Sequence, residues 1–198
     1  MKRLVQLNAS IGDRFLNKHS SQGSSLLELM VVILIVAMMA MITMPLLQKQ
    51  IAEREIDSVA RRFIAHTHFA RQQALHLGEQ VLIRPTTEIG WSNGWEVQSG
   101  CIAKLTGSGC TPKYWFSQGI IEPVYFKGGG KQFVDPHSGK SGILFNAAGA
   151  AKTGQGGFVA NRLILGHYRA PDLERQLILG SGGRWRICDP ARDAKRCH

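Results

Sequence analysis

Residues 24–47 read SSLLELMVVILIVAMMAMITMPLL, and this stretch decides the architecture of the chain. From Leu26 to Leu47 the sequence contains one charged residue, Glu28. About 20 consecutive apolar residues suffice for a helix to cross a bilayer. The sequence therefore predicts one transmembrane helix near the N-terminus.

The segment before this helix is basic. Residues 1–23 contain four basic residues and one acidic residue, a net charge of +3. Positive charge stays on the cytoplasmic side of a span, so we expect a single pass with the C-terminal part in the periplasm of a bacterium. A secretory signal peptide would instead need a shorter apolar stretch and a small-residue cleavage site, and no A-x-A follows Leu47.

Glu28 is the unusual residue of the span. A carboxylate inside a membrane helix costs about 2.5–3.5 kcal/mol on insertion scales and is functional by default. With its surroundings, QGSSLLELMVVILIVAMMAMITMP, it resembles the leader junction of type IV prepilins and type II secretion pseudopilins. The resemblance implies that residues 1–23 are a leader, which a prepilin peptidase removes between Gly23 and Ser24 before methylating the new terminus. Ser24 stands where Phe is usual in the family.

The same resemblance assigns roles to two residues of the helix. Glu28 becomes the fifth mature residue and is implied to pair with the N-terminal amine of a neighbouring subunit during assembly. Pro45 becomes the twenty-second, where pilins commonly have a helix-breaking proline, and a proline inside a helix removes one backbone donor. The segment 24–47 is thus expected to be the transmembrane and filament-core helix.

An amphipathic helix is predicted over residues 48–78. Its apolar residues recur at spacings of three, four or seven: Ile56, Val59, Phe63, Ala70, Ala74 and Leu77. Gly78 is expected to end the helix. His66, His68 and His76 are not spaced to share one helical face as i and i+4, so we expect no metal site here.

Residues 79–198 are predicted to form a β-rich globular domain with a basic C-terminal tail. Glycines separate eight strand-like runs: EQVLIRP, GWEVQSG, YWFS, PVYFK, ILFN, NRLILGHY, RQLILG and RWRIC. Several short strands after one long helix indicate an α+β fold. In this fold the long N-terminal helix has a transmembrane half and an amphipathic half, and the amphipathic half packs on an antiparallel β-sheet domain.

Three blocks of this domain resemble the FimT/GspH family of pilin-like proteins: ARQQALHLGEQVLIRP with NGWEV, then ILFNAAGAAKTG, then RQLILGSGGRWRIC. The resemblance implies the type IV pilin fold. Asn146 replaces the commoner Asp of the family's F-[DN]-x-x-G segment, and we expect this change to preserve the turn.

The four cysteines are Cys101, Cys110, Cys188 and Cys197. An even count in an oxidising compartment favours disulfides, and four cysteines allow three connectivities. We favour the two local pairs, Cys101 with Cys110 and Cys188 with Cys197. The sequence has no C-x-x-C or C-x-x-H, which argues against zinc.

Catalytic motifs are missing from the sequence. HSGKSG at residues 137–142 lacks the first glycine of a phosphate loop, because Val134 occupies that position. There is no G-x-S-x-G and no H-E-x-x-H. We therefore expect no enzymatic activity and no cofactor.

The basic tail GRWRICDPARDAKRCH is the main candidate site, in a chain of formal charge +10. On a strand, Arg184 and Arg186 project from one face and Trp185 from the other. We expect Arg192, Lys195 and Arg196 to lie near that face. Together with Arg184 and Arg186 they are predicted to bind phosphates of double-stranded DNA without sequence preference.

The resemblance supports this interpretation, because FimT-like minor pilins are linked to DNA uptake in natural transformation, the process of competence. It also implies other major and minor pilins as partners. The alternative function is purely structural. In that case the chain is a GspH-like pseudopilin or minor pilin that serves filament assembly in a type IV pilus or a type II secretion system.

Mass spectrometry of the membrane-extracted protein should find Ser24 at the N-terminus, because Gly23 and Glu28 have the spacing of a prepilin cleavage site. A protein that begins near Leu47 would contradict this prediction and indicate an ordinary secretory signal.

Overall fold

The computed structural model describes residues 25–102, 111–131, 133–152, 157–180 and 183–197, without the side chain of Arg196. The chain divides into two compact units, Met1–Met44 and Pro45–His198. One helix, α1 (Leu26–Leu77), contains the boundary between them, and Pro45 lies inside this helix.

The part of α1 in the first unit is apolar and exposed. Every residue from 25 to 51 is exposed, and the helix is long and apolar enough to cross a membrane by length and composition. An apolar helix whose side chains contact no core requires another apolar environment. Glu28 is in the first turn of this helix and is exposed with its neighbours.

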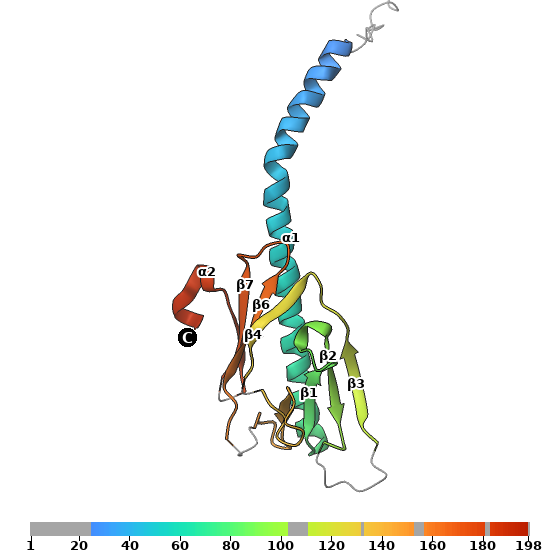
Figure 1. Cartoon of the computed structure of the whole chain (residues 1–198), viewed down its shortest axis with the longest axis vertical. Helices are drawn as coiled ribbons and strands as arrows, with labels where there is room; N and C mark the ends of the chain where they lie inside the picture. The colour runs from blue at the N-terminus through green and yellow to red at the C-terminus, as the bar shows by residue number, and fades with distance from the viewer. Residues whose placement is uncertain (1–24, 103–110, 132, 153–156, 181–182, 198) are drawn as a thin grey trace, which may run out of the picture. The chain divides into compact units, whose positions relative to one another are not determined.

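The second unit contains eight strands within the described ranges (Figure 1). Their bounds are β1 (Val81–Pro85), β2 (Trp95–Ser99), β3 (Lys113–Gln118), β4 (Val124–Gly129), β5 (Ile143–Phe145), β6 (Asn161–His167), β7 (Glu174–Leu179) and β8 (Trp185–Cys188). Each lies within one of the eight runs predicted from sequence, or extends it by one or two residues. Short helices η1 (Trp91–Asn93), α2 (Pro190–Asp193) and η2 (Ala194–Cys197) complete the unit.

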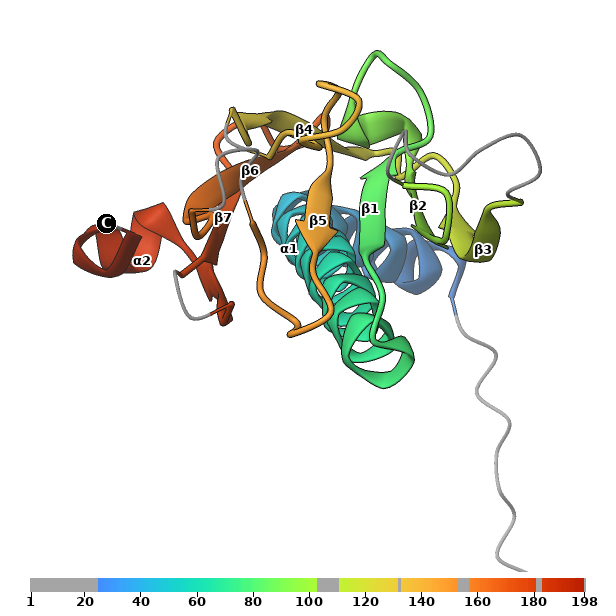
Figure 2. The same cartoon turned by 90° about the horizontal axis from the view of Figure 1, so that it is seen from below.

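The strands form two four-stranded sheets, which the sequence did not predict. The orders are β3-β2-β1-β5 and β4-β6-β7-β8, and the strand pairs are antiparallel. Figure 2 shows the second half of α1 beside both sheets, with β1, β2 and β3 to one side and β6 and β7 to the other. The helix is therefore the element that both sheets share.

The predicted apolar stripe of the helix is buried except at its end. Ile56, Phe63, Ala70 and Ala74 are fully buried, and Val59 is 7% exposed. Leu77 was predicted in the same stripe, but it is 38% exposed. The prediction fails there because Leu77 is the last helical residue, and Gly78 turns the chain away at a φ of +66°.

Phe63 is the centre of an aromatic cluster. Its ring meets those of Trp95 at 5.0 Å, Trp91 at 5.4 Å, Phe126 at 5.5 Å and Trp185 at 5.7 Å, each in edge-to-face geometry. Such pairs add about 0.5–1.5 kcal/mol each beyond the burial of area. Because Trp95 belongs to one sheet and Trp185 to the other, Phe63 connects the two sheets.

His66 lies one helical turn beyond Phe63 and accepts a hydrogen bond from Trp95 (Nε1 to Nδ1, 2.9 Å). Burial, and after it the charge of Arg62, lowers the pKa of His66 below its ordinary value of 6.5. The neutral imidazole is therefore the form that fits the folded state.

The turn after β5 confirms the expectation for Asn146. Its Oδ1 accepts hydrogen bonds from the backbone amides of Ala148 (3.1 Å) and Ala150 (2.9 Å), as a carboxylate would. Gly149 has a φ of +69°, which explains the glycine of the F-[DN]-x-x-G segment.

Phe63→Ala should lower the free energy of unfolding by about 3–5 kcal/mol, because the cavity lies where four aromatic rings meet. Urea unfolding of the full chain in neutral detergent measures this change. Ile89→Ala is the matched control, since Ile89 is 89% exposed and its loss should cost less than about 0.5 kcal/mol. Equal losses in the two variants would contradict a core centred on Phe63.

His66 should make stability depend on pH. Its pKa is lower in the folded than in the unfolded chain, so its contribution is present above pH 6.5 and is lost as the pH falls below that value. Urea midpoints measured between about pH 7 and pH 5 should fall less in His66→Gln than in the parent. His68→Gln, at an exposed position of the same helix, is the control for the loss of one imidazole.

Candidate functional site

The candidate site begins at the hairpin between β7 and β8. Arg184 and Arg186 are exposed, whereas Trp185 between them is 7% exposed and packs on Phe63 and Phe133. Alternation along a strand places the two arginines on the face opposite to Trp185, as predicted. Burial of the indole therefore fixes the direction in which both guanidinium groups project.

Arg162 of β6 lies on the same face as Arg186. In the register of the sheet, Arg162 is opposite Ile178 of β7, and Ile178 is opposite Arg186 of β8. Residues directly opposite one another share a face, and the backbones of two strands separated by a third are about 10 Å apart. Arg162 was not predicted from sequence, because its place beside Arg186 depends on strand register.

A hydrogen bond connects the turn before Arg184 to α1. Arg71 donates a hydrogen bond from Nη1 to the carbonyl oxygen of Gly183 (3.1 Å). Gly183 has a φ of +75°, and a Cβ there would lie 2.8 Å from the Arg71 guanidinium. The positive φ favours glycine immediately before Arg184, whereas a small shift of the flexible Arg71 side chain would relieve the contact.

A disulfide closes the C-terminal segment that contains α2 (Figure 1). Cys188 is bonded to Cys197, one of the two predicted pairs, with their Cα atoms 5.5 Å apart. Asp189 caps α2 by accepting a hydrogen bond from the amide of Ala191 (3.0 Å). Cys101 is also disulfide-bonded, and its predicted partner Cys110 lies outside the described residues.

Arg175 connects this segment to the helix. Its side chain is 6% exposed and makes ion pairs with Asp57 of α1 (2.8 Å) and Asp189 (3.0 Å). Removing one partner of a buried ion pair leaves an uncompensated charge. We call Arg175, Asp57 and Asp189 the buried ion triad; none of the three was singled out in the sequence.

Arg192 and Lys195, both predicted to bind DNA, differ in their surroundings. We call the five predicted DNA-binding residues the basic patch: Arg184, Arg186, Arg192, Lys195 and Arg196. Arg192 is 72% exposed, but it contacts the carboxylates of Asp189 (3.4 Å) and Glu53 (3.6 Å). These acids compensate its charge, so Arg192 contributes less to the patch than predicted. Lys195 is exposed, as expected of a phosphate-binding residue, whereas the side chain of Arg196 lies outside the described residues.

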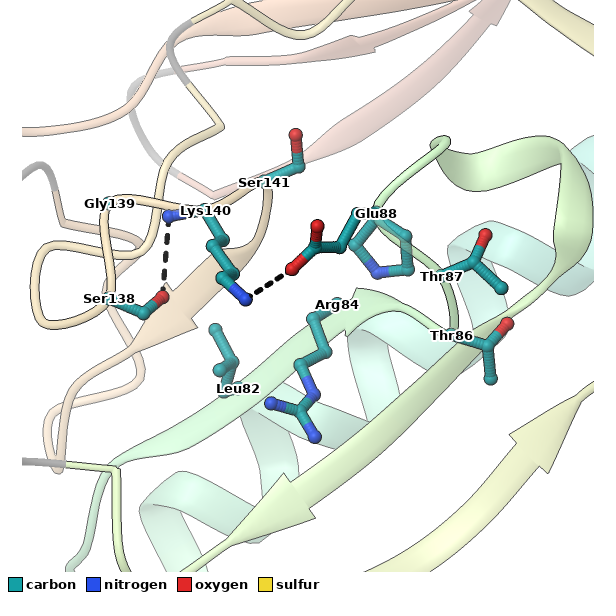
Figure 3. Close-up of a pocket in the computed structure, with 10 residues that line it drawn as sticks. Leu82, Arg84, Thr86, Thr87, Glu88, Ser138, Gly139, Lys140 and Ser141 are labelled. Atoms are coloured by element: carbon teal, nitrogen blue, oxygen red, sulfur yellow. Dashed lines mark hydrogen bonds and ion pairs between the residues drawn. The ribbon is translucent and has the colours of Figure 1, made fainter.

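A polar pocket of about 530 Å³ lies on the other sheet, between β1 and the turn that contains Lys140 (Figure 3). Figure 3 shows Lys140 and Glu88 pointing toward one another. Their Nζ and Oε1 atoms form an ion pair at 2.5 Å. The hydrogen bond from Lys140 and its positive charge lower the pKa of Glu88. Arg84 pairs with Glu96 (2.7 Å), so acids compensate both cations of the pocket.

The remaining predicted site residues are in the N-terminal segment. Gly23 and Ser24 lie outside the described residues. Among the residues that the structure describes, no group of three or more His, Cys, Asp or Glu side chains is arranged to hold a metal ion.

The profile of a protein family described as "Type II transport protein GspH" matches residues 59–197. Among solved structures, the type IV minor pilin FimU of Pseudomonas aeruginosa is similar at 16% identity and a TM-score of 0.50, over 70% of this chain and 92% of that chain. The minor pseudopilin EpsH of the type 2 secretion system of Vibrio cholerae matches at 12% identity and a TM-score of 0.48, over 69% and 98%. No curated protein matches the sequence. The likeness to FimU shows that the chain has the type IV pilin fold.

Arg175→Gln should lower the free energy of unfolding by about 1.5–3 kcal/mol, because Asp57 and Asp189 would lose the charged hydrogen bonds of their common partner, although both carboxylates, 39% and 18% exposed, stay accessible to water. Urea unfolding under non-reducing conditions measures the loss. Arg192→Gln is the matched control and should cost less than about 1 kcal/mol, since that side chain is exposed. Similar small losses in both variants would show that the buried ion triad does not fix the C-terminal segment.

Proposed function

The chain belongs to the GspH family, and from this premise we propose that it is a minor pilin that binds double-stranded DNA through the phosphate backbone during DNA uptake in natural transformation. The family consists of membrane-anchored minor pilins and pseudopilins that serve in assembly of a pilus or of a type II secretion pseudopilus. DNA binding is the additional property that we assign to this member.

The cationic outer face of the second sheet is the observation that carries the proposal. Arg162 and Arg186 occupy one cross-strand row, and Arg184, which directly precedes β8, is exposed as Arg186 is. Guanidinium groups bind phosphate oxygens through two parallel hydrogen bonds. Their spacing of about 10 Å across the sheet suits separate phosphates rather than one.

The chemistry of this face supports binding without sequence preference. Arg162 and Arg186 flank an aliphatic residue, Ile178. Gln176 of the same face accepts a hydrogen bond from Arg162 (3.4 Å) and donates one to Glu174 (3.1 Å), so its amide is engaged within the protein and not directed at base edges. Phosphate contacts position a protein on DNA and give affinities that depend on salt.

The N-terminal segment supports membrane anchoring and incorporation into a filament. We propose cleavage by a prepilin peptidase between Gly23 and Ser24, with the second unit then in the periplasm. Glu28 is exposed on an apolar helix. An unpaired carboxylate is costly in such surroundings, so a positive group from a neighbouring subunit, such as its N-terminal amine, would lower the cost of assembly.

Replacing Arg184 and Arg186 together by Gln should weaken DNA binding equally on unrelated duplex sequences. The plot of log K against log salt should become shallower by about 1.8, because each phosphate contact contributes about 0.9 to the slope. Adding Arg162→Gln should remove about 0.9 more. Salt-titrated gel shifts of the full chain in neutral detergent measure these slopes.

The double variant Arg54→Gln, Arg61→Gln is the control, because it removes two exposed charges of α1 and should leave the slope unchanged. Pilus or pseudopilus assembly should proceed normally in the Arg184 and Arg186 variant. If that variant binds DNA as the parent does, the DNA-binding proposal is wrong, and the purely structural role in filament assembly takes its place.

A further inference from the structure

A groove of about 590 Å³ lies at the end of the second unit where α1 enters it. Three segments form it: the first turns of α1 after Met44, the loop between β6 and β7, and α2. Its lining includes Pro45, Lys49, Arg169, Asp172 and Leu173. We call it the membrane-proximal groove, and its volume is in the range of small-molecule sites, about 300–1,000 Å³.

The lining of this groove begins inside the apolar stretch of the chain. Pro45 lines the groove and belongs to the stretch Leu26–Leu47, whose one charged residue is Glu28. Lys49, which also lines the groove, follows Leu47 by two residues, about 3 Å of helix. The headgroup layer extends about 5–8 Å beyond each side of the hydrocarbon core. A helical residue this close in the chain to the apolar stretch is therefore within reach of lipid headgroups when that stretch is in the membrane.

Three charged side chains that line the groove are available to a ligand. Three acids of its lining are paired, Glu53 with Arg192, Glu174 with Lys127 and Asp189 with Arg175. Within the part of the chain that the structure describes, no hydrogen bond or ion pair engages the side chains of Lys49, Arg169 or Asp172. Two cations and one carboxylate complement a headgroup that carries both a phosphate and an amine.

The neighbouring surface has the composition of a membrane interface. Tyr168 precedes Arg169, is 60% exposed and stacks on Tyr125 with ring centroids 4.5 Å apart. Leu46 and Leu47 are 61% and 58% exposed on the helix beside the groove. Tyrosine is enriched at the level of headgroups, and Lys and Arg extend their charged ends toward that level.

We propose that the membrane-proximal groove binds the headgroup of a membrane aminophospholipid, with Lys49 and Arg169 on the phosphate and Asp172 on the ammonium. The inference rests on the membrane anchoring contained in the proposed function, and is independent of DNA binding.

The test titrates phosphatidylethanolamine into the full chain in neutral detergent and counts bound lipid by native mass spectrometry. Lys49→Gln with Arg169→Gln should weaken binding about 30-fold, because each cation beside lipid phosphates contributes about fivefold. Asp172→Asn should reduce the preference for phosphatidylethanolamine over phosphatidylcholine, whose quaternary nitrogen donates no hydrogen bond. Arg54→Gln with Arg61→Gln, the matched loss of two charges on α1, should leave lipid binding unchanged.

Three results would overturn the inference. The first is equal lipid binding by the parent and the Lys49 and Arg169 variant. The second is binding of free phosphoethanolamine as tight as that of the lipid, which would indicate a soluble ligand. The third is a Lys49 and Arg169 variant that binds lipid as the parent does but no longer cross-links to other copies of the chain. That result would make the groove a subunit interface.

Two further measurements separate this inference from the proposed function. The Lys49 and Arg169 variant should bind DNA as the parent does, so a failure of lipid binding leaves the DNA proposal intact. The parent should stay in the membrane pellet after carbonate extraction. A parent released by carbonate would refute both the membrane anchoring and the lipid site.

Discussion

The packing of Phe63 against aromatic rings of both sheets is the interaction on which the second unit depends. Within the described residues the two sheets share no strand pair, so the helix is their common core. Trp95 contacts Phe63 from one sheet and Trp185 from the other. Because close-packed rings tolerate little displacement, a shift of the helix would disturb both sheets together. The helix that carries the apolar N-terminal segment is thus also the centre of the globular unit.

This core determines the candidate site on the opposite face of the second sheet. Leu163, Leu177 and Trp185 are buried in the core, so alternation turns Arg162 and Arg186 outward. Arg162 and Arg186 therefore lie on the same face without needing to contact one another. Their arrangement is the consequence of apolar packing behind them.

The formal charge of +10 overstates the charge that is available to an anionic partner. Arg175 is buried between two acids, Arg192 contacts two acids, and Lys140 pairs with Glu88. Ion pairs at these places stabilise the C-terminal segment and one loop instead of extending the basic patch. An interpretation based on net charge alone therefore assigns too many residues to binding.

The sequence by itself determined the elements and the faces that they bury. A period of 3.6 residues identified buried positions of the helix from Ile56 to Ala74, although it missed Ala52, Ala60 and Thr67. Alternation placed Arg184 and Arg186 on one face and Trp185 on the other. These are local properties, which each segment carries in its own pattern. Only the tertiary structure decided that the strands form two sheets, that Arg162 lies in the row of Arg186, and that acids surround Arg175 and Arg192. Strand register and ion pairing join residues distant in sequence, and packing of the whole core selects them.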